Sequence, residues 1–161
     1  MILVGVACAL LMIFTTLIHY EALRMTSAVL PHLHMRSRTK PVVVIIAAFV
    51  AHVVEIALYA VTIYVLTRWF DVGALGGEGA PSFAATAYFS AETYTSLGYG
   101  DVVPHGPLRL LAGAEALNGL LLIGWSASFI FVAMERFWNV EGDEQDERRG
   151  RKAKRGTRMR K

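Results

Sequence analysis

The chain has 161 residues, of which 55% are hydrophobic and only 18% are charged, with a formal net charge of +3. An ordinary soluble domain has about 25% charged residues, so this composition excludes a disordered chain and a soluble nucleic-acid-binding module. A single cysteine, Cys8, also excludes a secreted disulfide scaffold. Nine basic and five acidic residues lie from Glu141 onward, which leaves seven basic and eight acidic residues before it. The composition therefore indicates an integral membrane protein whose basic character comes from its tail.

Three long apolar segments predict three transmembrane helices. They run from Ile2 to Ile18, from Val42 to Leu66 and from Leu108 to about Phe137. A spanning helix needs about 20 apolar residues, so the first segment is barely long enough. The third, at about 30 residues, exceeds the bilayer unless it tilts or extends into the cytoplasm. Because the first segment lacks the basic start and the cleavage site of a signal peptide, we interpret it as a retained helix.

Basic residues set the expected orientation. The linker between the first two segments contains Arg24, Arg36, Arg38 and Lys40, and the tail after the third segment is also basic. Positive charge favours the cytoplasmic side, so we expect the N-terminus outside and the C-terminus in the cytoplasm. The expected divisions are a peripheral helix (1–20), a cytoplasmic linker that follows the membrane surface (21–41), a central domain (42–138) and a charged tail (139–161).

A shorter apolar and aromatic segment, 82–95, lies between the second and third spans. It is too short to cross the bilayer, so we expect a re-entrant helix. Ser96-Leu97-Gly98-Tyr99-Gly100-Asp101 follows directly. Non-helical backbone at membrane depth is tolerated only where protein buries it or where it lines water. Alternating glycines permit backbone angles that turn successive carbonyls to one side, where a ring of such strands would replace the water shell of a cation.

The stretch from Thr95 to Asp101 resembles the signature of tetrameric potassium channels. The resemblance covers roughly Val42 to Phe137 and points to bacterial channels with two transmembrane helices around one pore loop. It implies an all-α membrane protein that has three transmembrane helices, a re-entrant pore helix and a selectivity-filter loop, and that assembles as a tetramer. The pore domain (42–138) then comprises an outer helix (42–67), a pore helix (82–95), a filter (96–100) and an inner helix (107–138).

The resemblance also assigns the filter residues, Ser96, Leu97, Gly98, Tyr99 and Gly100. The backbone carbonyls of the first four would bind K⁺, and the Ser96 hydroxyl would form the innermost site. Ser96 replaces the usual threonine and keeps a hydroxyl, whereas Leu97 replaces valine or isoleucine and must fit behind the filter. We expect potassium to be preferred over sodium, because Tyr99 retains the family's aromatic residue.

Filter support is expected from residues on both sides of the filter. Tyr88 and Phe89 are interpreted as core packing or as a cuff that holds the filter at its diameter, and Tyr88 stands where close relatives have tryptophan. Thr95 directly precedes the filter. Glu92 and Asp101 are expected to lie close together behind it and to share a proton, with a solvated pair at the outer mouth as the alternative.

The third segment carries the residues expected to gate the pore. Gly119 and Gly124 fall where similar channels have a hinge glycine and a deeper small residue, although close helix packing also explains Gly119. One face contains four apolar residues at spacings of three or four, namely Leu120, Ile123, Ala127 and Phe131. By resemblance this face lines the cavity and gate, whereas periodicity alone equally suits a face against another helix or lipid.

His52 and Glu55 lie one helical turn apart near the middle of the second span. Ionisable groups at this depth need partners, and this spacing lets the two side chains face each other. A structural hydrogen-bonded pair and a proton-sensing pair are both open interpretations. Glu115 and Asn118 on the third segment are the candidate partners.

The sequence thus predicts a potassium-selective channel that conducts passively as a homotetramer in the bacterial inner membrane. The alternatives are a weakly selective monovalent cation channel and a non-conducting membrane anchor or oligomerisation module. We expect no enzyme activity, no nucleic-acid partner and no cofactor beyond the permeant K⁺. The tail is interpreted as a solvated segment, or as one that binds anionic lipid or acidic segments of neighbouring subunits.

Overall fold

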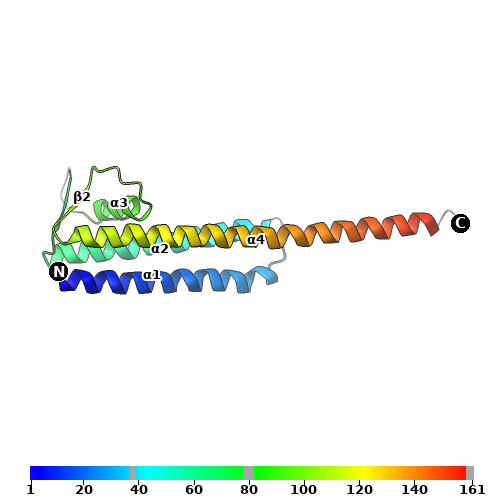
Figure 1. The fold of residues 1–161 in the computed structure, drawn as a ribbon, viewed down its shortest axis with the longest axis horizontal. Coiled ribbons are helices and arrows are strands. Elements are labelled where there is room, and N and C mark those ends of the chain that lie inside the picture. Colours follow the sequence, from blue (N-terminus) through cyan, green and yellow to red (C-terminus); the bar gives the residue numbers. More distant parts are fainter. Residues whose placement is uncertain (37–38, 78–81, 159–161) are drawn as a thin grey trace.

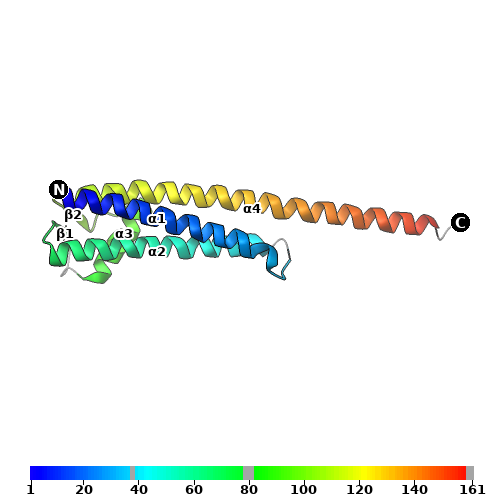
Figure 2. The ribbon, with the colours of Figure 1, turned by 90° about the horizontal axis from the view of Figure 1, so that it is seen from below.

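The computed structural model describes residues 1–36, 39–77 and 82–158, with side chains through Arg136. Three long helices lie side by side, α1 (Ile2–Val29), α2 (Lys40–Trp69) and α4 (Leu108–Arg158) (Figures 1 and 2). Each contains a stretch that is long and apolar enough to cross a membrane. The expected all-α membrane fold with three transmembrane helices is therefore confirmed.

Helix α1 is longer than the sequence predicted. It continues without a break to Val29 and ends in a single 3-10 turn, η1 (Leu30–His32), so the expected division between a helix (1–20) and a linker (21–41) is wrong. The reason is local, because no proline interrupts the chain before Pro31 and Glu21 pairs with Arg24 one turn later, at 2.7 Å.

One stripe of α1 is buried against the other two long helices, and it consists of Val4, Cys8, Leu11, Thr15, His19 and Leu23. These residues follow each other at spacings of three or four, which places them on one face of the helix. The face contacts both α2 and α4, whereas the sequence analysis predicted a peripheral helix. Helix α1 is thus part of the bundle rather than an attachment to one helix.

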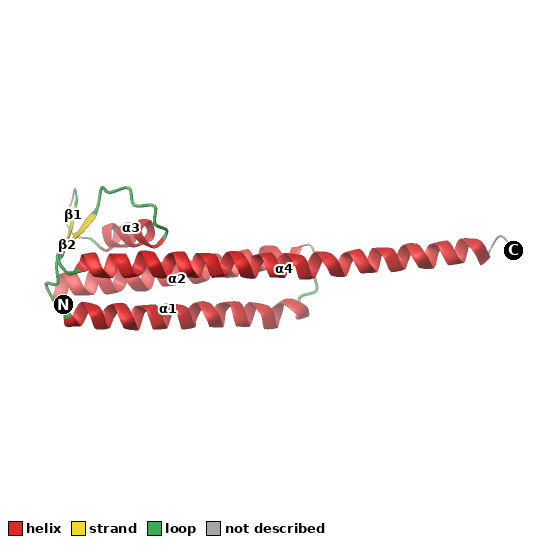
Figure 3. Ribbon diagram, viewed as in Figure 1, coloured by secondary structure: helices red, strands yellow, loops and turns green. Residues whose placement is uncertain are grey.

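The segment between α2 and α4 forms a small outer cap on the bundle. The short helix α3 (Phe83–Tyr94) packs against α2 and α4 at the end where the N-terminus lies (Figure 1). Strand β1 (Ala74–Gly76) pairs antiparallel with β2 (Val103–His105), with Leu75 opposite Pro104 (Figure 3). This two-stranded ribbon was not expected from the sequence, and it ties the two ends of the pore loop together.

Helix α4 has 51 residues and continues through the charged tail to Arg158, so the expected inner-helix end at residue 138 is wrong. No proline follows Pro107, and the acidic residues before Glu147 are followed by basic residues at helical spacing, which favours a helix. The predicted lipid and neighbour contacts of the tail lie outside the described side chains.

The main core lies at the outer half of the bundle, where all four helices contribute. Its buried members are Val4, Cys8, Leu11, Tyr59, Ile63, Leu66, Phe89, Tyr94, Leu108, Leu111 and Ala112. A second, smaller cluster of Leu30, Val44 and Ala133 closes the opposite end. The outer core holds the pore helix in place, and the functional candidates lie around it.

Candidate functional site: the pore loop and its support

Helix α3 begins and ends with side chains that satisfy its exposed backbone groups. The Ser82 hydroxyl accepts a hydrogen bond from the Ala85 amide at 3.1 Å, as an N-cap residue does. At the other end the Thr95 hydroxyl donates to the Ala91 carbonyl at 2.8 Å. The helix therefore stops at Tyr94, directly before the predicted filter.

The backbone of the predicted filter has a left-handed residue at every second position. The φ angles are 58° at Ser96, 53° at Gly98 and 80° at Gly100. Positive φ is unusual for a residue with a side chain, and the sequence analysis anticipated it only for the two glycines. Alternation between positive and negative φ turns successive carbonyls toward the same side, which is the geometry that a carbonyl-lined ion path requires. Every residue from Thr95 to Gly100 is exposed in the single chain.

Glu92 holds this loop from behind. Its side chain is only 4% exposed, and one carboxylate oxygen accepts a hydrogen bond from the Tyr99 amide at 3.2 Å. Its backbone carbonyl accepts from the amide of Leu97 at 2.8 Å. The same carbonyl also lies 3.3 Å from the amide of Gly98, so Glu92 accepts from three amides of the predicted filter, which fits a supporting role for this residue.

Asp101 lies on the open side of the loop. It accepts hydrogen bonds from the Val102 amide at 3.0 Å and from the Tyr88 hydroxyl at 3.4 Å. Desolvation and the bond to Asp101 raise the pKa of Tyr88, so its phenol remains a donor at neutral pH. Among the described residues, Glu92 and Asp101 form hydrogen bonds to different partners and not to each other. The structure therefore has no direct hydrogen bond between the two carboxyl groups in which a proton could be shared.

Phe89 and Gly119 pack the pore helix against α4. Phe89 is buried in the outer core. A methyl group added at Gly119 would lie 2.1 Å from the carbonyl oxygen of Tyr94, so only glycine permits this approach of the two backbones. At Gly124 the same methyl group would meet open space. The two glycines of α4 therefore lie in different surroundings, and Gly119 is a close-packing residue.

The predicted cavity face of α4 is open among the residues whose side chains the structure describes. All four of its members are exposed, namely Leu120, Ile123, Ala127 and Phe131. The face opposite this one carries Leu122, Ser126 and Ala133, which are buried. An apolar face of this size faces lipid, a cavity or another subunit.

Behind the pore helix, four helices bring together a set of hydrogen-bonded side chains that we call the buried polar cluster: His19, His52, Glu55, Tyr94 and Ser126. Glu55 lies within hydrogen-bond distance of Nδ1 of His19 (2.9 Å), Nδ1 of His52 (3.1 Å) and the hydroxyl of Tyr94. The Tyr94 hydroxyl also lies 2.9 Å from Nδ1 of His52. The hydroxyl of Ser126 bonds to Nε2 of His52 at 3.0 Å and to Nε2 of His19 at 3.1 Å. The cluster therefore joins α1, α2, α3 and α4 at one point.

The candidate partners expected for Glu55 were wrong. Glu115 bonds to Ser90 of the pore helix, and Asn118 donates to the hydroxyl of Thr15 at 2.7 Å. The sequence analysis missed His19, Tyr94 and Ser126, which come from three other elements. The one available signal was His19, a polar residue at the end of an apolar run.

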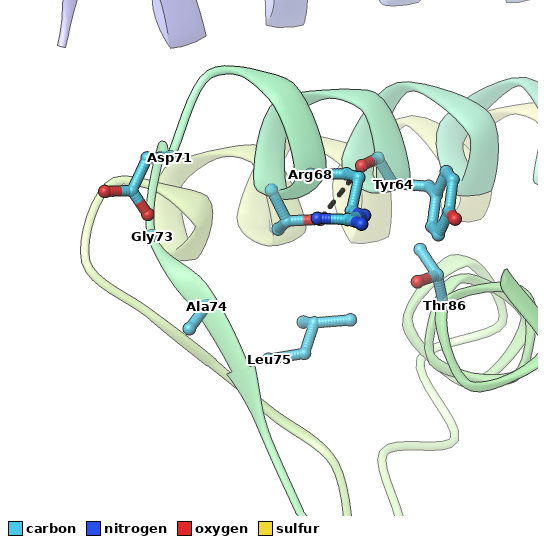
Figure 4. Close-up of a pocket in the computed structure, with 8 residues that line it drawn as sticks. Tyr64, Arg68, Asp71, Gly73, Ala74, Leu75 and Thr86 are labelled. Atoms are coloured by element: carbon cyan, nitrogen blue, oxygen red, sulfur yellow. Dashed lines mark hydrogen bonds between the residues drawn. The ribbon is translucent and has the colours of Figure 1, made fainter. Parts of the chain in front are cut away.

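A small pocket lies at the outer end of the bundle, apart from the filter. Its volume is about 210 Å³, and it is lined by Tyr64, Thr67, Arg68, Asp71, Gly73, Ala74, Leu75 and Thr86. Figure 4 shows Arg68 and Tyr64 of α2 beside Leu75 of β1 and Thr86 of α3. The pocket thus separates the end of α2 from the ribbon and the first turns of the pore helix.

The short helix α3 and the exposed segment after it thus lie between two long apolar helices, α2 and α4. Residues 42–136 match the profile of the ion channel family, which covers more than half of the chain, so the protein belongs to this family. A stretch of 56 residues, 34% of the chain, is 39% identical to the inward rectifier potassium channel Kirbac3.1 of Paramagnetospirillum magnetotacticum. The aligned stretch spans 19% of that relative's length. No solved structure gives a significant match.

Proposed function

We propose that this chain forms a homotetrameric, potassium-selective channel that conducts K⁺ passively. The observation that carries the proposal is the exposed segment from Ser96 to Gly100, with its alternating left-handed residues at the end of a short helix. Potassium as the permeant ion is supported by the similarity to an inward rectifier potassium channel. The ion would exchange its water for the carbonyl oxygens of Ser96, Leu97, Gly98 and Tyr99, with repulsion between neighbouring ions driving it onward.

Assembly into a ring follows from what one chain leaves uncovered. A single filter segment supplies oxygen ligands from one side only, so an ion needs further copies to complete its shell. The apolar face of Leu120, Ile123, Ala127 and Phe131 would then line the central cavity. The C-terminal end of α3 carries partial negative charge and would favour a cation there. We place any bend of the inner helix at Gly124, because Gly119 is clamped against Tyr94.

The membrane orientation is part of the same proposal. We infer that the N-terminus and the pore loop face the outside of a bacterial inner membrane, with the α1–α2 connection and the tail in the cytoplasm. The arrangement of the helices supports it, since the N-terminus lies at the pore-loop end and the chain ends at the other (Figure 1). The basic tail would meet anionic lipid headgroups.

A weakly selective cation pore is the second candidate, and one observation favours it. Leu97 is 58% exposed, so within one chain nothing fixes the side chain that replaces the family's smaller residue. A filter with less support behind it would discriminate less sharply between ions of different size.

Reconstituted vesicles test these functions directly. We expect K⁺ flux that exceeds Na⁺ flux by at least tenfold and that barium blocks, and we expect Tyr99→Asp to remove this preference. Tyr99→Phe is the matched control, because it keeps the aromatic ring and should keep the selectivity. Equal K⁺ and Na⁺ flux in the unchanged protein would favour the weakly selective pore. Tetramers that pass no ion would favour a non-conducting anchor.

A further inference from the structure

The buried polar cluster has the composition of a metal site. One ligand atom each from His19, His52 and Glu55 lies within 4.8 Å of the other two. His19 and Glu55 are completely buried, and the side chain of His52 is 17% exposed at the edge of the cluster. Two imidazole nitrogens and a carboxylate oxygen are a ligand set that Zn²⁺ and related divalent metals take.

The hydrogen bonds of the cluster converge on the atoms that would bind a metal. Nδ1 of His19 lies 2.9 Å from Glu55, and Nδ1 of His52 lies 3.1 Å from Glu55 and 2.9 Å from the Tyr94 hydroxyl. Both Nε2 atoms meet the hydroxyl of Ser126. Without a metal, two neutral histidines satisfy this network when His19 carries its proton on Nδ1 and His52 carries its proton on Nε2.

A metal ion would select one tautomer for both rings. With both Nδ1 atoms bound to a metal, each neutral ring carries its proton on Nε2. The oxygen of Ser126, which has two lone pairs, then accepts from both rings. Histidine ligands in metal sites usually donate their other N–H to such an outer acceptor, which fixes the orientation of the ring. The Ser126 hydroxyl therefore lies where it can accept a hydrogen bond from each of two metal-bound histidines.

We propose that the buried polar cluster binds one divalent transition metal ion per chain, with Zn²⁺ as the best-fitting ion. The ligands are Nδ1 of His19, Nδ1 of His52 and the carboxylate of Glu55, and the hydroxyl oxygen of Tyr94 lies in position to be the fourth. A Tyr94 phenolate together with Glu55 would balance the two positive charges of the ion, which suits a site that is largely buried. The partly exposed edge at His52 is the way in.

Such a site would connect α1 to the pore. His19 comes from α1, the other two ligands come from α2, and Tyr94 is the last residue of α3 before the filter. Metal binding would therefore fasten the first helix to the base of the pore loop. This inference depends on the cluster alone and holds whichever ion the pore conducts.

Metal content of the full-length protein tests the proposal. The tag-free protein in detergent is stripped with a chelator, dialysed against zinc chloride, washed and measured by mass spectrometry. We expect about one zinc per chain in the unchanged protein and less than a tenth of that in His19→Gln and in Glu55→Gln. The double variant His32→Gln/His34→Gln is the matched control, since these exposed histidines lie outside the cluster, and it should retain the metal.

Two further measurements keep the proposal testable if the ligand variants fail to fold. Ser126→Ala removes no ligand but removes the outer acceptor, and it should weaken zinc binding by about 10- to 100-fold. Cobalt in place of zinc should give the strong visible absorption of a four-coordinate site in the unchanged protein and not in Ser126→Ala at the same concentration.

Three results would overturn the metal site. One is a folded, unchanged protein that holds no zinc above the background of dialysis. The others are zinc that persists in His19→Gln, and zinc that disappears with His32 and His34, which would mark an adventitious ion only. A channel whose activity follows pH but ignores zinc would favour the proton-sensing interpretation of His52 and Glu55 instead.

Discussion

Two regions with opposite character meet at one peptide bond, between Tyr94 and Thr95. Tyr94 is fully buried and belongs to the buried polar cluster, where Glu55 lies within hydrogen-bond distance of three other side chains. From Thr95 to Gly100 every residue is exposed in the single chain. The hydrogen bonds of the cluster all form within one chain, whereas the predicted filter segment lies open on its surface. A buried, hydrogen-bonded group of side chains therefore lies directly behind an exposed loop.

Loss of the Glu55 carboxylate should be the most damaging change to the buried polar cluster. We expect Glu55→Ala to lower the free energy of unfolding by about 3–5 kcal/mol, because it leaves two histidines of the cluster without their shared hydrogen-bond partner. Thermal or denaturant unfolding in detergent measures the loss. Glu21→Gln is the control, since Glu21 is 47% exposed in its pair with Arg24 and should be tolerated without measurable change. An equal loss in both variants would contradict the central role of the cluster.

The close contact between Gly119 of α4 and the backbone of Tyr94 should be the next most sensitive to substitution. We expect Gly119→Ala to lower the free energy of unfolding by about 1–3 kcal/mol, because the new methyl group collides with the Tyr94 carbonyl. Gly124→Ala meets open space and should be neutral or slightly stabilising, since alanine favours a helix over glycine. Equal tolerance of both substitutions would contradict the close-packing role of Gly119.

The next prediction concerns the hydrogen bond that Glu92 accepts from the Tyr99 amide of the predicted filter. Glu92→Ala removes the acceptor of the Tyr99 amide, and a hydrogen bond to a charged group contributes about 1.5–3 kcal/mol. We expect the current through the open channel to decay at a rate that differs by about tenfold or more from that of the unchanged protein, because this free energy corresponds to such a factor. Glu92→Gln keeps an oxygen acceptor and should decay at nearly the original rate. Identical decay in all three proteins would remove Glu92 from filter support.

The smallest effect is expected at the hydrogen bond between Thr15 of α1 and Asn118 of α4. Thr15→Ala removes the acceptor of the Asn118 amide and should cost about 1 kcal/mol of unfolding free energy. Thr16→Ala is a closely matched control, because Thr16 is exposed and its hydroxyl bonds only to Met12 of the same helix, at 2.6 Å. If the two variants gave the same unfolding curve, the hydrogen bond to Asn118 would make no measurable contribution to the stability of the protein.

How much the sequence predicts depends on whether the signal is local. The three spans and the short helix before Ser96 follow from apolar length, which the sequence displays directly. The chain past Tyr20 was interpreted as a separate segment along the membrane surface, although Leu23 extends the buried stripe of α1. The partners of Glu55 from other helices could not be predicted, since His19 and Tyr94 lie 36 and 39 positions away along the chain.

Helix α4 passes from the pore-facing segment into the charged tail without a break. At a rise of about 1.5 Å per residue it is about 75 Å long, whereas the hydrocarbon core of a bilayer is about 30 Å thick. More than half of its length therefore projects beyond the apolar layer as a rod. The charged tail therefore continues the same helix well outside the segment that the family profile covers.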